Sequence, residues 1–295
     1  MSEVELLKFI GPPHDFQSLA SLADLTMNEK GRQLSLGIDA QYWLYQAYQN
    51  VCQSGGPPRN EQILELSLTW VTVLHSMAID AVFVFTGPFV LDRVDGLYEA
   101  SIDAKVISSF QCAILEKGFE IHHSLKDTGV ELGYLEVDGI LSNDVHVFFS
   151  MAKMILRNVL PLNNQCNLDV YYPEHLRRRA NYPIRPIGLF LIAILTGCGY
   201  APGVPGLTIE NAYPLSNTEL GVLLCLAAED LKQERLETYL RETWNPKLRQ
   251  ELSLNPHEFL PLQLPMIAQN VNACFPNSLI VRYLAPYVTY KGTFS

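Results

Sequence analysis

Residues 187–206 constrain the fold of this chain more than any other segment. They begin with the longest apolar run of the sequence, residues 187–196, and end with a Gly-Val-Pro-Gly sequence that starts at Gly203. The run is far too short for a bilayer, which needs about 20 apolar residues. The segment therefore predicts an apolar helix that leads into a tight hairpin, and a protein with no membrane partner.

The composition is that of a globular protein. The 295 residues are 48% hydrophobic, which is enough to bury a full core in one large domain or two small ones. Six cysteines are scattered without a Cys-x-x-Cys pair, so we expect a reducing compartment and neither a zinc knuckle nor a disulfide framework. The acidic start, with Glu3 and Glu5, is unlike a signal peptide. These features predict a nuclear or cytoplasmic location.

The net charge of the chain affects how readily it can bind nucleic acids. The net charge is −10, whereas nucleic-acid binders usually display a basic stripe, because neutralising phosphates supplies most of their affinity. The run Arg177, Arg178 and Arg179 can meet phosphate, or it can form a solvated turn between polar, Pro-rich segments. Tyr42 and Trp43 are expected to pack a helix rather than to stack on bases.

Apolar runs alternate with helical patterns over the first half of the chain. The runs at 34–39, 81–85, 119–122 and 139–142 predict strands, and the patterns at 42–52, 63–77, 97–117 and 131–136 predict helices. This alternation indicates an α/β fold with a mostly parallel sheet flanked by helices. Ligands gather at the carboxyl ends of such strands, where Asp39, Thr86, Asn143 and Asp144 lie.

The character of the sequence changes after Gly206. Residues 208–252 predict helices, with a strongly apolar stretch at 220–231, and the chain is punctuated by prolines from residue 255 onward. We therefore place a domain boundary near residue 205. It separates an α/β part, residues 1–205, from a helical part, residues 206–295.

Five segments, in chain order, resemble motifs of the flap endonuclease/XPG superfamily. Residues 33–45 resemble LxxGIDASIWLY, 82–88 resemble xVFVFDGP, 131–135 resemble the end of GEAEAELAYL, 141–158 resemble LTDDVDTLLFGATMILRN, and 191–206 resemble LLxGxDYxxGVPGxG. Residues 244–252 and 275–287 are similar to the C-terminal part of fungal Holliday-junction-resolvase-like members. Because the match runs in order over most of the chain, chance is a poor explanation for it.

The resemblance implies a PIN-like fold with a helix-two-turn-helix element and a helical C-terminal region. It also implies Mg²⁺-dependent, structure-specific cleavage of branched DNA, as in DNA-repair nucleases. In such a site about seven carboxylates hold two Mg²⁺ or Mn²⁺ ions, which activate water and steady the leaving oxygen.

This chain has few carboxylates at the positions that correspond to the catalytic acids of the family. Asp39 and Asp144 occupy two acidic positions, and Asp127 corresponds to a third. The remaining positions carry residues without a carboxylate, namely Thr86, Gly129, His146 and Gly199. The resemblance thus implies vestigial catalytic acids. At most, Asp39, Asp144 and His146 would hold one weakly bound Mg²⁺ or Mn²⁺ ion, and the alternative is a protein that uses no metal.

Each candidate also has a structural interpretation. Asp39 and Asp144 can be ligands, or strand-end acids that cap the next helical turn. His146 can bind Zn²⁺ or Mn²⁺ beside Asp144, or it can be a hydrogen-bonded core residue. Cys198 has no evident His partner in the sequence, so a buried structural thiol is expected there rather than a nucleophile.

The DNA-contacting parts of the family pattern are altered too. The family's small N-terminal Gly is Ser2 here, and residues 87–104 contain a single basic residue, Arg93, among four acids. The hairpin keeps Gly203 and Gly206, which implies a DNA-binding hairpin. Glu210, however, stands where a phosphate should approach, and this weakens the anion site at the start of the next helix.

These features favour a pseudonuclease. Such a protein would keep the nuclease scaffold and act by binding a protein partner or, weakly, branched DNA or RNA. The alternative is a divergent Mg²⁺- or Mn²⁺-dependent, structure-specific DNA endonuclease that uses Asp39, Asp127, Asp144 and His146.

Overall fold

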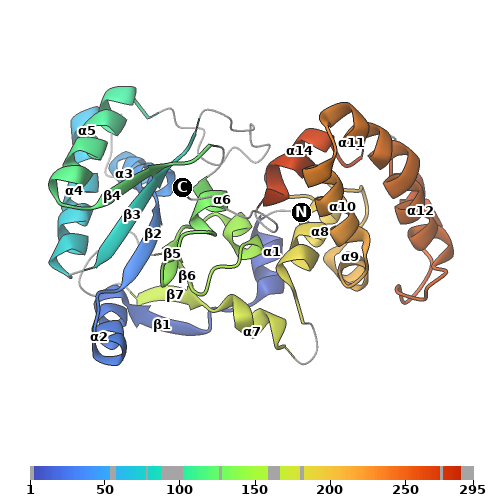
Figure 1. The fold of residues 1–295 in the computed structure, drawn as a ribbon, viewed down its shortest axis with the longest axis horizontal. Helices are drawn as coiled ribbons and strands as arrows, with labels where there is room; N and C mark the ends of the chain where they lie inside the picture. Colours follow the sequence, from blue (N-terminus) through green and yellow to red (C-terminus); the bar gives the residue numbers. More distant parts are fainter. Residues whose placement is uncertain are drawn as a thin grey trace.

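A single mixed sheet organises the first part of the protein (Figure 1). The computed structural model describes residues 3–53, 58–77, 79–87, 102–125, 128–158, 167–179, 183–272 and 275–286. The sheet order is β1-β7-β6-β5-β2-β3-β4. The strands are β1 (Asp15–Ser18), β2 (Ser35–Asp39), β3 (Asp80–Phe85), β4 (Glu120–His123), β5 (Gly139–Leu141), β6 (Ile155–Arg157) and β7 (Asn167–Tyr171). Strands β2 to β6 pair in parallel, and β7 is antiparallel to both β6 and β1. The prediction of a mostly parallel α/β fold is confirmed.

One face of the sheet packs against an aromatic layer. Its helices are α2 (Leu19–Lys30), α3 (Ala40–Gln53), α4 (Asn60–Ser76) and α5 (Ala104–Glu116). Trp43 is fully buried, with its ring centroid 6.0 Å from that of Trp70 and 5.4 Å from that of Phe83. Its indole nitrogen donates a hydrogen bond to the Ser67 carbonyl at 3.3 Å. Tyr42 is also buried, so the expected packing role of these two aromatic residues is confirmed.

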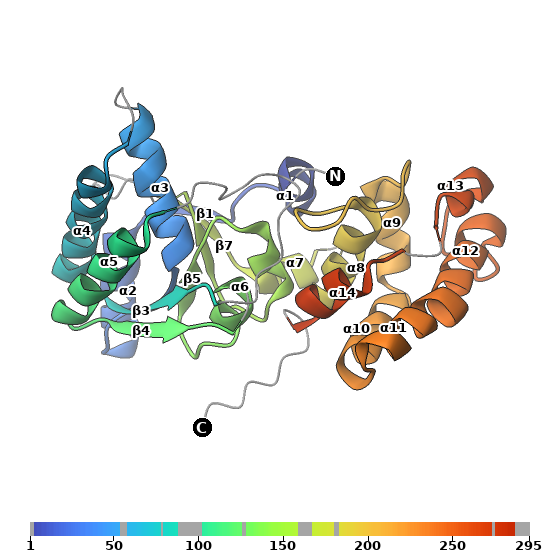
Figure 2. The same cartoon turned by 90° about the horizontal axis from the view of Figure 1, so that it is seen from above.

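The opposite face carries a second layer, which leads into the C-terminal helices (Figure 2). This layer consists of α1 (Glu3–Ile10), α6 (Thr128–Leu132), the 3-10 turn η1 (Val145–Phe149), α7 (Pro173–Arg177) and α8 (Pro186–Thr196). The C-terminal elements are α9 (Ile209–Ser216), α10 (Leu220–Asp230), α11 (Gln233–Tyr239), the π-helical turn η2 (Leu240–Trp244), α12 (Asn245–Leu254), α13 (Pro265–Gln269) and α14 (Ser278–Leu284). In the described part of the chain, no helix is both long and apolar enough to cross a membrane.

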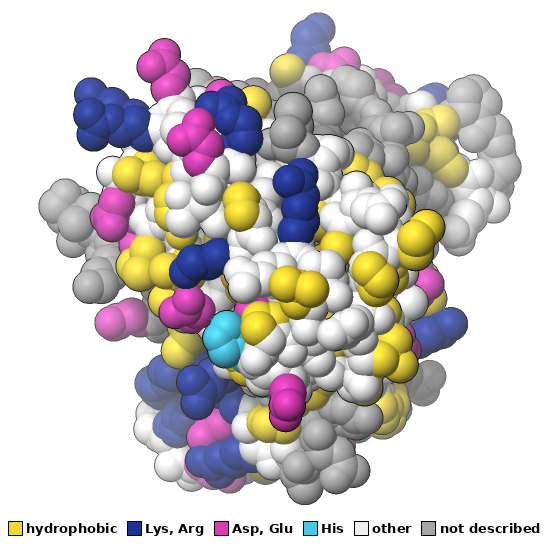
Figure 3. All heavy atoms as spheres, turned by 90° about the vertical axis from the view of Figure 1, so that its right-hand side faces the viewer, with side chains coloured by type: hydrophobic (Ala, Val, Ile, Leu, Met, Phe, Trp, Pro, Cys, Tyr) yellow, Lys and Arg dark blue, Asp and Glu magenta, His cyan; other side chains and the backbone are white. Residues whose placement is uncertain are grey.

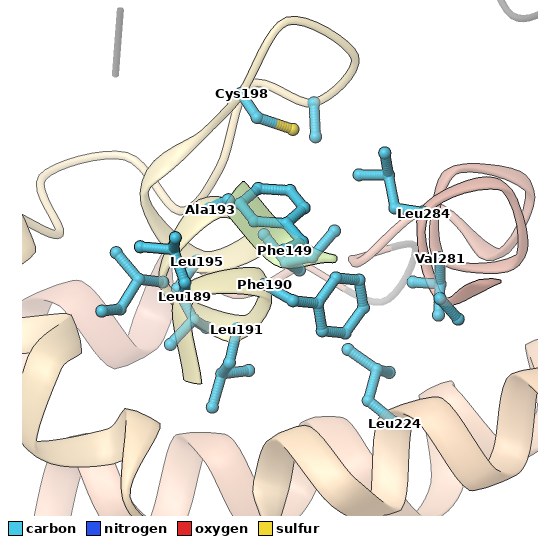
Figure 4. Close-up of a cluster of buried hydrophobic side chains, with 14 of the residues drawn as sticks. Phe149, Leu189, Phe190, Leu191, Ala193, Leu195, Cys198, Leu224, Val281 and Leu284 are labelled. Carbon is cyan, nitrogen blue, oxygen red and sulfur yellow. The ribbon is translucent and has the colours of Figure 1, made fainter. Parts of the chain in front are cut away.

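Helix α8 joins the two parts. Every residue from 188 to 196 is buried, as expected of a helix that is apolar all round. Its Phe190 lies among Phe149 of η1, Leu224 of α10 and Leu284 of α14 (Figure 4). Because one buried cluster extends from η1 to α14, the sheet and the C-terminal helices share a core.

Most expected elements are present, with shifted ends. The helix expected at 131–136 lies one turn earlier, at Thr128–Leu132, and the first residues of the helix expected at 97–117 fall outside the described ranges. The sequence did not indicate β1, α2, β6 or β7. Strand β1 is a half-exposed edge strand in which Phe16 is 60% exposed, and β6 has three residues, so neither shows the periodicity that marks a strand.

The hairpin after α8 is fixed to the end of that helix. The amide of Val204 donates to the Leu195 carbonyl at 2.7 Å, and the amide of Leu207 donates to the Val204 carbonyl at 3.0 Å. Gly203 has φ +74°, and a Cβ there would lie 2.4 Å from the Gly197 nitrogen. The close backbone approach therefore requires glycine at this position.

We expect Gly203→Ala to destabilise the fold by about 2–4 kcal/mol, because it combines left-handed backbone strain with a steric clash. Gly31→Ala is the matched control. Gly31 has φ +66° but open space where its Cβ would lie, so only the strain of about 1 kcal/mol should appear. Urea unfolding followed by circular dichroism measures both changes. Equal destabilisation by the two substitutions would contradict the close approach of the hairpin to α8.

Candidate functional site

The carboxyl ends of the parallel strands bring several predicted residues together. The register pairs Asp39 of β2 with Val84 of β3, and Val84 with His122 of β4. On the other side of β2, the Ser142 hydroxyl donates a 2.8 Å hydrogen bond to Asp39 Oδ2. This edge is where α/β sheets bind ligands, so the structure places Asp39 and its neighbours where the strand pattern predicts a site.

Asp39 is 2% exposed and accepts hydrogen bonds at both carboxylate oxygens. Oδ1 accepts from the backbone amide of Tyr42 at 3.0 Å, and Oδ2 accepts from Ser142. A side-chain oxygen bonded to an amide three residues later is the geometry of a helix N-cap. Asp39 thus caps α3 while being tied to the end of β5.

Asp144 is bound even more closely to its own turn. Oδ1 accepts from the backbone amide of His146 at 2.9 Å and lies 2.6 Å from Nδ1 of the His146 ring. The Asp144 amide donates to the Ser142 hydroxyl at 3.1 Å. Because the same hydroxyl donates to Asp39, Ser142 links the two strand-end acids in one hydrogen-bonded chain.

His146 is completely buried, with its ring centroid 5.3 Å from that of Phe149 and 5.0 Å from that of Tyr200. Burial acts to lower the pKa of this imidazole, but the charge and hydrogen bond of Asp144, together with the nearby Cys198 side chain, outweigh it and raise the pKa to about 10. The ring is therefore an imidazolium at neutral pH. A buried cation occupies the position where the superfamily motif has an aspartate.

Cys198 is buried, as predicted, and its side chain helps to raise the pKa of His146, which lies 52 positions earlier in the chain. No pattern in the sequence indicated that the two residues lie close together. Gly199 follows in a tight turn that is closed by the Cys198 amide donating to Ala201 O at 2.8 Å and by the reciprocal bond at 3.0 Å.

The other positions of the catalytic pattern provide little for a metal. Thr86 follows β3 and is half-buried, and Gly129 lies in α6. Asp127 falls outside the described residues. Across the ranges that the structure describes, no three His, Cys, Asp or Glu side chains are grouped so that they could hold a metal ion.

Glu131 is an acid at this edge that sequence reasoning missed. It is buried in α6, with Oε2 3.5 Å from Nε2 of His122. The residue lies within the motif segment at 131–135 but not at one of the acidic positions considered. The shift of this helix to Thr128–Leu132 accounts for its burial, because α6 packs on β2 and β3.

The hairpin glycines lie away from the strand-end acids, at the junction of α8, α9 and α13. The side-chain amide of Asn270 donates to the Pro205 carbonyl at 2.8 Å, so Gly203 and Gly206 belong to a closed turn. At the start of α9, a hydrogen bond with Thr208 lowers the pKa of Glu210. This keeps a negative charge where the motif would receive a phosphate.

The three consecutive arginines have different environments. Arg178 is exposed and pairs with Glu174. Arg179 donates to the carbonyls of Phe9 and Ile10 at the end of α1, and a nitrogen of Arg177 contacts the sulfur of Met151 at 3.3 Å. Only one of the three therefore behaves as the side chain of a solvated turn.

The structure is similar to solved nuclease structures. It matches the junction-resolving enzyme GEN-1 bound to cesium with 25% identity and a TM-score of 0.71, over 96% of this chain and 64% of that one. A GEN1 complex with product DNA and Mg²⁺ gives 24% identity and 0.70 over the same shares. The catalytic core of Rad2 with DNA substrate gives 17% and 0.57, over 92% and 82%.

The likeness to GEN1 and Rad2 confirms the resemblance to the flap endonuclease/XPG superfamily and its PIN-like fold. The chain spans 64% of the length of the GEN1 chains. No model of a known protein family matches this sequence, and no curated protein matches it either.

The Asp144–His146 pair predicts how stability depends on pH. Because the folded pKa of His146 is raised from 6.5 to about 10, its contribution is complete below pH 6.5 and is lost as the pH rises towards 10. We expect His146→Asn to be less stable at pH 6.5 and to lose less stability than the parent between pH 7 and 10. Urea unfolding at several pH values tests this, with the exposed His75→Asn as the matched control. Parallel pH profiles for the parent and His146→Asn would contradict the ion pair.

Proposed function

We propose that this chain is a catalytically impaired member of the flap endonuclease/XPG superfamily, which uses the nuclease scaffold for binding. The observation that carries the proposal is the internal pairing of the strand-end acids. Asp39 caps a helix and accepts from Ser142, and Asp144 faces a buried imidazolium.

The donor set does not suit a two-metal centre. Two divalent ions bring four positive charges and require several carboxylate oxygens. The described edge offers Asp39, Asp144 and Glu131, and His146 cancels one of these negative charges. A divalent ion beside Asp144 would also meet the His146 cation in a water-poor environment, where like charges repel strongly.

The divergent nuclease remains the second candidate because of two specific observations. GEN1 has been crystallised with product DNA together with Mg²⁺ and Mn²⁺, and Asp127, outside the described ranges, would add one carboxylate to Asp39 and Asp144. In that case the ion would be Mg²⁺ or Mn²⁺, and His146 would have to lose its proton before it could act as a ligand.

The distribution of charged side chains on the surface supports the proposed partners. On the face in Figure 3, Lys and Arg side chains lie at the upper left, singly in the middle and at the lower left, with Asp and Glu side chains among them. Because a dispersed basic surface supports only weak phosphate binding, we propose a protein partner, with weak binding of branched DNA or RNA as a secondary interaction. A DNA partner would imply a nuclear location.

Cleavage assays on flap, junction and single-stranded substrates test this function directly. With about 10 mM Mn²⁺, which is roughly a thousand times a Kd of about 10 μM, we expect no cleavage by the parent chain. Cleavage by the parent that disappears in both Asp39→Ala and Asp144→Ala would establish the divergent nuclease instead.

Restoring acids at the lost positions provides the complementary test. We expect the triple variant Thr86→Asp, His146→Asp and Gly199→Asp to gain thermal stability on addition of Mn²⁺, because the added carboxylates repel one another until a cation binds. Gly199 does not have a positive φ, so its backbone accepts a side chain. The control adds Asp39→Asn to the triple variant and should lose most of the gain. An equal Mn²⁺ response in the parent would contradict the proposal.

A further inference from the structure

A concave site lies at the opposite end of α9 from the hairpin. It is a cavity of about 510 Å³ between the end of α7, the start of α8 and the turn from α9 to α10. Its polar lining comes from Arg177, Arg185, Ser216, Asn217, Thr218 and Glu219. Pockets of about 300–1,000 Å³ are typical of small-molecule sites, so the cavity can admit a group the size of a nucleotide.

The two arginines make the cavity electropositive. In the described part of the chain, neither Arg177 nor Arg185 has a carboxylate within 4.0 Å. Nε of Arg177 is buried and has no hydrogen-bond partner. The one acid in the lining, Glu219, is paired with Lys247 at 3.2 Å. The positive charge of the arginines is therefore left for a ligand.

Two helices also begin at this cavity, with their positive ends towards it. Helix α8 starts after Arg185, and α10 starts after Glu219. Neither N-cap residue forms a side-chain capping bond, although the Thr218 hydroxyl accepts from the Leu220 amide at 3.3 Å. Backbone amides in the first turn of a helix favour anions, and here two such turns line the same pocket as the two guanidinium groups.

We propose that this cavity binds the terminal phosphate of a nucleic-acid strand. A terminal monoester carries close to two negative charges, whereas an internal phosphate carries one, so two guanidinium groups beside two helix N-termini favour the terminal group. Arg177 and Arg185 provide paired donors that match phosphate oxygens. Ser216 and Thr218 already donate their hydroxyl protons to the carbonyls of Tyr213 and Leu215, each at 2.6 Å, so the remaining donors to phosphate are the first-turn amides of the helices.

The position of the cavity connects it with the hairpin. Helix α9 separates the two and has eight residues, which corresponds to about 12 Å at about 1.5 Å per residue. A strand rises about 3.4 Å per nucleotide in a duplex, so an end held in the cavity places the fourth or fifth phosphate, counting the terminal one as the first, near Gly203. This proposal rests on the proposed binding of DNA or RNA. It does not depend on whether the protein has lost catalytic activity.

Fluorescence anisotropy with a labelled 12-nucleotide strand tests the proposal. The strand is supplied with a 5′-phosphate, a 3′-phosphate or hydroxyl ends, in EDTA so that cleavage plays no part. We expect one phosphorylated end to bind about tenfold tighter than the hydroxyl strand, which corresponds to about 1.4 kcal/mol. The double variant Arg177→Gln and Arg185→Gln should abolish that preference.

Arg178→Gln is the matched control, because it removes a neighbouring arginine that pairs with Glu174 and does not line the cavity. It should keep the preference. If the double variant does not fold, Val222→Glu places a carboxylate at the cavity from a side chain that is 42% exposed, and it should also abolish the preference.

Three outcomes would overturn the proposal: equal binding of phosphorylated and hydroxyl strands, loss of the preference in Arg178→Gln to the same degree, or displacement of the strand by adenosine monophosphate at equal concentration. The last result would assign the cavity to a free nucleotide. Mn²⁺-dependent cleavage by the parent would end the pseudonuclease proposal and leave the phosphate preference in EDTA unaffected, so the two failures are distinguishable.

Discussion

The burial of α8 on all sides is the constraint on which the rest of the structure depends. Because each fully buried Leu, Ile or Phe contributes about 1.5–3 kcal/mol, a helix with this composition is stable only when other elements cover its whole circumference. Helices α9 and α10 and the turn η1 provide that cover. The end of α8 therefore has a fixed position relative to the sheet, and it brings Cys198 against His146.

Under the proposed function, the strand-end acids have a structural role instead of that of metal ligands. A hydrogen-bonded chain runs from Asp39 through Ser142 to Asp144 and His146. In a two-metal site the repulsion between carboxylates is relieved by cations, whereas here an imidazolium within the fold relieves part of it. Removing one partner of a buried ion pair usually costs about 3–5 kcal/mol, so we propose that the pair stabilises this edge of the sheet without metal ions.

The sequence predicted the strands and helices that have a clear apolar run or a periodic apolar pattern. Apolar runs identified β2, β3, β4 and β5, and motif order identified the superfamily. It did not reveal β1 or β6, because an exposed edge strand and a three-residue strand carry no periodic signal. It also missed the contact between His146 and Cys198 and the burial of Glu131, which depend on tertiary packing between distant segments. Asp39 and Asp144 were identified correctly as strand-end acids, but only the structure shows what they bind.

The central claim is that the strand-end acids at the carboxyl edge of the sheet are balanced in charge without a pair of divalent ions. The most direct test is a crystal structure grown with Mn²⁺, with an anomalous difference map collected at the manganese edge. The account predicts no anomalous peak between Asp39 and Asp144, with Asp144 still hydrogen-bonded to His146. Two peaks about 4 Å apart at the carboxyl ends of β2 and β5, with His146 turned away from Asp144, would contradict it.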